Sequence, residues 1–152
     1  MIKQHVRGTA YGVILNDAVS VQKIGSLEEA PYKGAPKAPV LYIKPANTRT
    51  GCGATVDLPQ GAHSVEVAAT VGLVIGQAAA RVTAADALGH VSGLVLAADL
   101  SLPHASYYRP AIKEKCFDGA LPLSSVKPLV DIAGLTLVTE IDGEVVDRRP
   151  LN

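Results

Sequence analysis

Short apolar runs that end at turn-forming residues constrain the fold of this chain more than any other feature. Six such runs follow one another along the sequence: residues 11–15, 40–43, 64–75, 94–98, 135–141 and 144–146. Their length and their content of Val, Ile and Leu are typical of strands. The prolines and the glycine between residues 26 and 39 exclude regular structure there and predict a crossing segment over the surface. The sequence therefore predicts an α+β, mainly β domain with few short helices.

Two of these runs carry additional signals. Residues 64–75 are apolar on both faces in their second half, which predicts a central, buried strand. Asp142-Gly143 separates the last two runs and is the strongest short hairpin signal in the chain. We therefore expect one fully covered strand and one hairpin near the end of the sequence.

One helix is predicted from local signals. Thr83 can cap its first turn, and Asp86 follows three residues later, as in a capping box. The alanines that follow favour a helix, and Gly89 or Gly93 ends it. We expect this helix to be short.

Two ionisable side chains stand at the ends of predicted strands. Asp99 follows the apolar run 94–98, so its carboxylate emerges from a core sheet and needs a cation. That cation can be a divalent metal, Arg109 or Lys115. Lys44 closes the run 40–43 and either extends to water or reaches a substrate carboxylate.

The segment 107–119 gathers two phenols, five charged groups and a thiol within an apolar chain. One interpretation is a solvated surface loop, because loops are polar by default. The other is a site in which the cations of this segment converge on an anion. Sequence spacing alone leaves both interpretations open.

Composition limits the partners. The 152 residues fit one domain, and 14 basic residues balance 14 acidic ones, so we expect no nucleic-acid backbone to bind. The longest apolar run, 67–75, is too short to span a bilayer, and the start of the chain has no signal core, so no membrane partner is expected. A hydrophobic content of 48% favours an additional subunit contact, and hence an oligomer.

Several chemistries lack their motifs. The chain has no G-x-S-x-G elbow, no P-loop and no dinucleotide fingerprint. His63, His90 and His104 have no metal-ligand spacing to one another or to a cysteine. Cys52 and Cys116 match no disulfide framework and are expected to be reduced thiols of a cytoplasmic protein.

With these elements in order, the chain resembles the fumarylacetoacetate hydrolase family. The motifs that carry the resemblance are Asn16 after a strand, residues 42–48 (Tyr-Ile-Lys-Pro-Ala-Asn-Thr), residues 71–76, Asp99 with Ser101, and residues 115–122. The Ser-Leu-Pro and Tyr-Arg-Pro-Ala-Ile-Lys segments are most similar to the first half of the two-domain isomerase/decarboxylases of 4-hydroxyphenylacetate (homoprotocatechuate) degradation. The similarity runs through nearly the whole chain.

The resemblance implies the mixed β-roll of this family. Residues 1–152 would form one domain, with an N-terminal strand and the proline-rich crossing segment in residues 1–39. Active relatives continue past the hairpin at Asp142-Gly143, whereas this chain stops at Asn152. The expectation is a domain that lacks the family's C-terminal strands and exposes an edge or apolar patch for another chain to cover.

The resemblance also implies a site. The family holds Mg²⁺ or another hard divalent cation with two glutamates in an E-x-E arrangement and an aspartate that matches Asp99. Such a cation binds and polarises a 2-oxo acid. Lys115 matches the catalytic lysine, and Lys44, Arg109 and Asp118 are implied to bind the substrate.

The two glutamates of the family pattern are missing. Their positions align with Ala68 and Thr70, neither of which can donate a carboxylate. Glu66 comes two residues too early, which displaces it by about 7 Å along a strand. One carboxylate alone is a poor Mg²⁺ site unless the substrate supplies most of the remaining ligands.

Two hypotheses follow from the resemblance. In the first, the chain is an isomerase/decarboxylase domain acting on small 2-oxo or 2-hydroxydienoate dicarboxylates by metal-assisted enolate chemistry, which would make it an isomerase and a lyase. In the second, it is a catalytically degenerate half that packs against a metal-competent partner domain or subunit. Ala68 and Thr70 favour the second, and a homo-oligomer or a pairing with a second family domain is expected.

Overall fold

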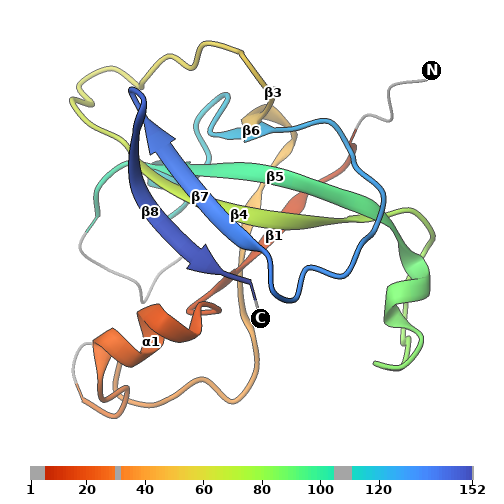
Figure 1. The fold of residues 1–152 in the computed structure, drawn as a ribbon. Coiled ribbons are helices and arrows are strands. Elements are labelled where there is room, and N and C mark those ends of the chain that lie inside the picture. Colours follow the sequence, from red (N-terminus) through yellow and green to blue (C-terminus); the bar gives the residue numbers. More distant parts are fainter. Residues whose placement is uncertain (1–5, 30–31, 105–110, 152) are drawn as a thin grey trace.

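The computed structural model describes residues 6–29, 32–104 and 111–151. Arg109, together with Tyr107 and Tyr108 of the charged segment 107–119, lies outside these residues. Figure 1 shows two long strands crossing the middle of the molecule, with shorter elements arranged around them. No helix in the described ranges is long and apolar enough to cross a membrane.

A four-stranded sheet forms the centre of the fold. Its strands are β3 (Arg49–Gly51), β6 (Leu121–Leu123), β5 (Val91–Ser101) and β4 (Glu66–Ile75), in that spatial order. β3 and β6 are parallel, and β5 runs antiparallel to both of its neighbours. Five of the core's apolar side chains come from β5 and the start of β6, so the sheet buries its apolar surface around these strands: Leu94, Val95, Ala97, Leu100 and Leu121.

The strand expected at the centre lies at an edge. Within the described residues, β4 pairs only with β5, and its Leu73 and Ile75 are 53% and 60% exposed. The prediction of a central strand over 64–75 is therefore wrong, because one apolar face of β4 remains partly open to solvent. β5 takes the central position instead and continues to Ser101, so Asp99 lies inside the strand and not at its end.

A two-stranded ribbon packs beside this sheet. β1 (Ala10–Ile14) and β2 (Val40–Lys44) are antiparallel, and Gly12 stands opposite Tyr42. A Cβ added at Gly12 would collide with the ring of Tyr42, so the ring fills the space that this glycine leaves. Both strands agree with their predicted positions.

The helices differ most from expectation. α1 (Ala18–Ile24) forms between the first predicted strand and the crossing segment, where no helix was predicted, and no proline or glycine interrupts its seven residues. The helix predicted from Thr83 is reduced to a turn and the 3₁₀ helix η2 (Ala87–His90). The Thr83 hydroxyl donates to the Asp86 carboxylate at 2.6 Å, so these two side chains bond each other instead of capping backbone N–H groups.

Two shorter helical elements complete the set. The 3₁₀ helix η1 (Ala46–Thr48) follows β2 directly, and the single-turn α2 (Ile112–Lys115) lies within the charged segment 107–119. α2 contacts β5, which brings one end of that segment against the central sheet.

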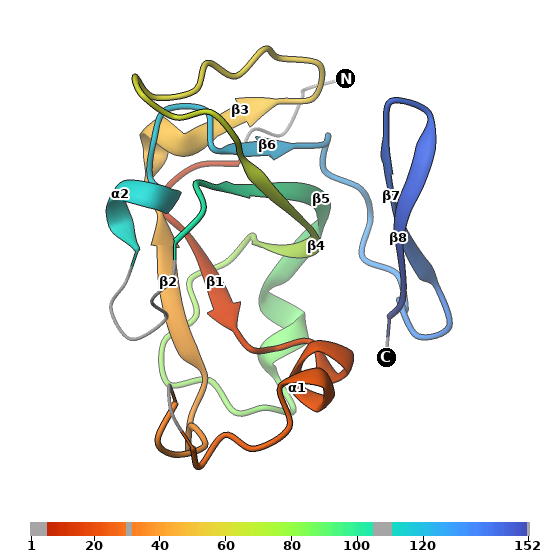
Figure 2. The same cartoon turned by 90° about the vertical axis from the view of Figure 1, so that its left-hand side faces the viewer.

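The predicted hairpin is present at the end of the chain. β7 (Thr136–Ile141) and β8 (Glu144–Pro150) pair antiparallel around Asp142 and Gly143, whose φ angles of 53° and 84° suit a tight two-residue turn. β8 runs beyond the predicted end at residue 146. Figure 2 shows the hairpin as a separate layer to one side of the central sheet, which it contacts through β4 and β7.

Candidate functional site

Asp99 is the centre of a buried cluster of ionisable groups. It lies in β5 and is only 4% exposed. Its Oδ1 atom is 2.7 Å from the ammonium of Lys44, and its Oδ2 atom accepts a hydrogen bond of 2.5 Å from the Tyr42 hydroxyl. The ammonium of Lys115 lies 3.4 Å from the same Oδ2. Two cations and one phenol therefore surround a single carboxylate.

Lys44 is held entirely inside the protein. It is 2% exposed, and its ammonium donates to the carbonyl oxygens of Leu100 at 2.6 Å and Ala120 at 3.1 Å. Two of the three N–H donors of the ammonium thus have carbonyl acceptors, and Asp99 adds an ionic contact in which its Oδ1 accepts no hydrogen bond. Burial lowers the pKa of Lys44, and the neighbouring Asp99 carboxylate partly offsets this effect. The expectation that Lys44 extends to water is therefore wrong, whereas its predicted contact with a substrate carboxylate stays a prediction.

Tyr42 was not among the predicted site residues. It stands two positions before Lys44 on β2, so both side chains project from the same face of the strand. Its ring also lies under the Lys115 ammonium, 4.7 Å from the ring centroid. Burial raises the pKa of the Tyr42 phenol well above its usual value, and the hydrogen bond to Asp99 adds to the shift. The two-residue spacing to Lys44 is the sequence signal that could have identified it.

Lys115 and Tyr42 are the members of the cluster that line a surface hollow. The side chain of Lys115 is 19% exposed. The hollow is lined by Tyr42, Ile43, Ala111, Ile112, Lys115 and Cys116. The Cys116 thiol, which like Cys52 is free, donates to the Ile43 carbonyl at 3.4 Å, and burial raises its pKa. The ammonium of Lys115 thus faces this hollow, whose volume of about 10 Å³ is close to that of a single water site.

Asp118 does not join the cluster. Its Oδ1 accepts a 2.8 Å hydrogen bond from the Asn47 amide, which also donates to the Cys116 carbonyl at 3.0 Å. Asp118 lines a second, open hollow together with Asp57 and Phe117. The structure therefore brings Asp99, Lys44 and Lys115 together and places Asp118 apart from them. Its predicted substrate contact stays a prediction.

The strand register tests whether a divalent cation fits beside Asp99. Ala68 stands directly opposite Asp99, and Thr70 stands opposite Ala97, so positions 68, 70 and 99 share one face of the sheet. Glu66 pairs with Ser101, one step farther along that face. The described part of the chain contains no group of three or more His, Cys, Asp or Glu residues able to hold a metal. Because the one available carboxylate is also paired with two ammonium groups, these residues do not fit a hard divalent cation.

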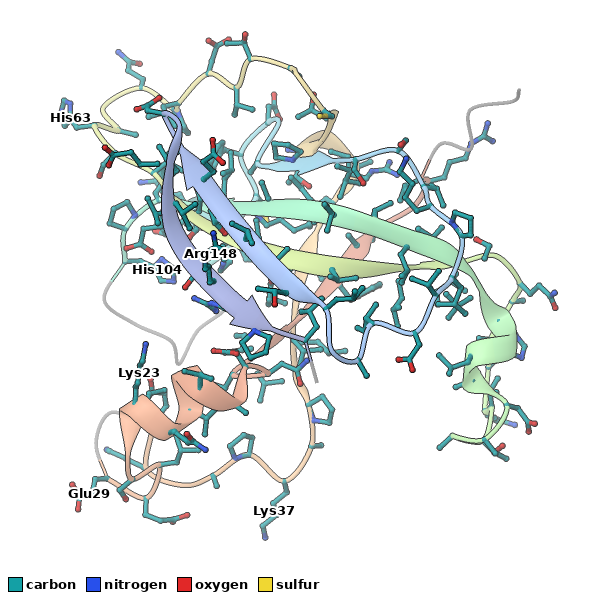
Figure 3. All side chains as sticks on the ribbon, viewed as in Figure 1. Lys23, Glu29, Lys37, His63, His104 and Arg148 are labelled. Carbon is teal, nitrogen blue, oxygen red and sulfur yellow. The ribbon has the colours of Figure 1, made fainter. Side chains whose placement is uncertain are left out.

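Several other ionisable side chains are exposed on the surface. Figure 3 shows the side chains of Lys23 and Glu29 directed outward near α1, that of Lys37 directed outward from the loop before β2, and His63 projecting from the loop before β4. His104 contacts the carbonyl of Leu102 through Nδ1 at 2.9 Å. These positions give no reason to extend the candidate site to the histidines.

Comparison with known proteins gives one consistent family. A family profile described as Fumarylacetoacetate (FAA) hydrolase C-terminal matches residues 9–152. The 4-hydroxyphenylacetate degradation bifunctional isomerase/decarboxylase of Escherichia coli is 41% identical over 144 residues, which cover 94% of this chain and 33% of that protein. The chain therefore spans about a third of the length of this curated relative.

Solved structures share the fold. The crystal structure of 5-carboxymethyl-2-hydroxymuconate delta-isomerase from Mycobacterium smegmatis matches with a TM-score of 0.79 and 24% identity, covering 97% of this chain and 57% of that one. Fumarylpyruvate hydrolase from Pseudomonas aeruginosa, in complex with Mn²⁺ and pyruvate, matches with a TM-score of 0.70 and 22% identity, covering 95% and 64%. At these identities the likeness establishes the fold, which confirms the predicted fold class.

Proposed function

The chain belongs to the fumarylacetoacetate hydrolase family, and we propose that it forms the half of an isomerase/decarboxylase that holds no metal and supports a metal-competent partner domain or subunit. Named members of the family are enzymes, among them isomerase/decarboxylases and oxaloacetate tautomerases. The substrate of the assembled enzyme would be a 2-oxo or 2-hydroxydienoate dicarboxylate from 4-hydroxyphenylacetate breakdown. This substrate class rests on the similarity to the E. coli relative.

One observation carries the proposal. The carboxylate that matches the metal-binding aspartate of the family is paired with Lys44 and Lys115, and Ala68 stands opposite it. A metal that polarises a 2-oxo acid needs several oxygen ligands, which this arrangement does not supply. A relative three times as long has room for a second domain that supplies them.

A second candidate function is catalysis by this chain itself. The partly exposed Lys115 ammonium at the hollow favours it, since such a group can hold a substrate carboxylate. In that case Lys115 would contribute to substrate binding or to the stabilisation of an enolate.

Substitution of Lys115 in the assembled enzyme separates the two functions. Lys115→Gln removes the ammonium but keeps a polar side chain, and Lys113→Gln on the exposed side of α2 is the matched control. For a supporting half we expect both variants to keep decarboxylase and isomerase rates within about twofold of the unmodified enzyme, because an effect on the chemical step needs contact with the reacting groups. A loss of about a hundredfold in Lys115→Gln alone, with unchanged thermal unfolding, would establish catalysis by this chain.

A further inference from the structure

The missing glutamates are one of two obstacles to metal binding at Asp99. Ala68 and Thr70 remove two ligands, but an aspartate with a free oxygen would still offer a third. In this structure both oxygens of Asp99 lie against other groups, although Oδ1 accepts no hydrogen bond and has only an ionic contact. Oδ1 faces the buried ammonium of Lys44, and Oδ2 accepts the Tyr42 phenol beside Lys115.

We propose that the Tyr42 hydroxyl, whose ring packs against Gly12, occupies the Asp99 oxygen that a divalent cation approaching from the hollow would bind. Asp99 then positions Lys115 and is not a metal ligand. Oδ2 is the oxygen shared by Tyr42 and Lys115, and both of these residues line the hollow. The inference concerns what occupies the metal position. Its test does not depend on whether this chain supports a metal-competent partner, as proposed above.

The three groups around Asp99 differ in how easily they could give way to a metal. Lys44 is fixed by two backbone carbonyls and cannot leave without exposing them. Lys115 is partly exposed and 3.4 Å away, so it can swing toward solvent. Tyr42 makes the shortest contact to Oδ2, and its ring is confined. Tyr42 is therefore the group that decides whether Oδ2 is open.

Gly12 is what allows Tyr42 to take this position. The two residues face each other across β1 and β2, and any Cβ at position 12 would occupy the same space as the ring. The absence of a side chain at Gly12 thus leaves the space that the Tyr42 ring occupies. A larger residue at position 12 would push the phenol off Asp99 without deleting it.

Because of the register, glutamates placed at 68 and 70 would project from the same face as Asp99. Both positions are exposed on an edge strand, so longer polar side chains can be accommodated there. If only those ligands were missing, Ala68→Glu with Thr70→Glu would complete a site of three carboxylates. If Tyr42 also closes Oδ2, the two glutamates are insufficient.

Calorimetric titration with Mn²⁺ tests this difference in the full 152-residue chain. The variants are the double variant Ala68→Glu/Thr70→Glu, the same pair with Tyr42→Phe, and a control pair with Tyr11→Phe. Phenylalanine keeps the ring over Gly12 and under Lys115 but removes the hydroxyl. Tyr11 lies on β1 and is 66% exposed, so Tyr11→Phe removes a phenol away from Asp99.

We expect no saturable Mn²⁺ binding by the unmodified chain. Adding Tyr42→Phe to the double variant should tighten its Mn²⁺ binding at least about tenfold, because the Asp99 carboxylate is then free of the phenol hydrogen bond. The Tyr11→Phe control should match the double variant. If Tyr42→Phe prevents folding, judged by circular dichroism, Gly12→Ala in the double variant displaces the phenol and should also tighten binding. Equal Mn²⁺ affinity with and without the Tyr42 hydroxyl, or Asp99-dependent binding by the unmodified chain, would overturn the proposal.

Discussion

Replacing Lys44 with methionine removes the ammonium and keeps a side chain of similar length. The change leaves Asp99 without its buried ion-pair partner and leaves the carbonyls of Leu100 and Ala120 without the donor that now serves both. Removing one partner of a buried pair costs about 3–5 kcal/mol. Since the free energy of unfolding of a whole domain is about 5–15 kcal/mol, we expect Lys44→Met to remove a large part of the stability.

Urea unfolding followed by circular dichroism measures this loss as a lower transition midpoint at an unchanged slope. Lys115→Met is the matched control, because its ammonium is partly exposed and contacts the same carboxylate at 3.4 Å. For the control we expect a loss of about 1 kcal/mol or less.

The double variant Lys44→Met/Asp99→Leu gives a second check. Replacing both members of a buried pair by apolar groups leaves fewer uncompensated charges, so it should be more stable than Lys44→Met alone. If Lys44→Met lost less than about 1 kcal/mol, or if it and Lys115→Met lost equal amounts, Lys44 would not hold the cluster together as inferred here.

Two further predictions concern Tyr42. Its pKa in the folded chain is raised above the ordinary value of 10.0, so the unfolded chain loses the phenol proton at a lower pH than the folded chain. The stability that this shift contributes is therefore complete below pH 10 and is lost as the pH rises from there toward the folded pKa. Urea midpoints should therefore fall more steeply above pH 10 in the unmodified chain than in Tyr42→Phe, and parallel curves would contradict this. Gly12→Ala should lower the free energy of unfolding by about 1–3 kcal/mol through its collision with the Tyr42 ring. The same substitution should cost less in a Tyr42→Leu chain, and an equal cost in both would refute the contact.

The six longer strands could be predicted because their signals are local, whereas β3 and β6, of three residues each, were not predicted. The hairpin at Asp142 and Gly143 needs positive φ at both turn residues, and the dipeptide itself supplies them. The assignment of β4 to the sheet centre failed for the opposite reason. An apolar run shows that a strand can be covered on both faces, but which strand occupies the centre depends on pairing with residues far away in the chain, here the long register with β5.

The candidate site was predictable only in part. The family resemblance identified Lys44, Asp99 and Lys115, and the structure brings all three together. The direction of the Lys44 side chain was not predictable, because its acceptors at Leu100 and Ala120 are backbone carbonyls, which carry no sequence signal. Tyr42 has a sequence signal in its two-residue spacing to Lys44, but its contact with Asp99 joins residues far apart in the chain and depends on the space that Gly12 leaves.

Lys44 also links parts of the chain that are far apart in sequence. Its backbone belongs to the β1–β2 ribbon, whereas its ammonium bonds to β5 and to the residue before β6 in the other sheet. The Lys44 ammonium loses its bound water only when the ribbon and the sheet pack together. An amine-reactive reagent would therefore modify Lys44 only while the ribbon and the sheet are separated. The loss of Lys44 reactivity during folding thus reports when the two pack together.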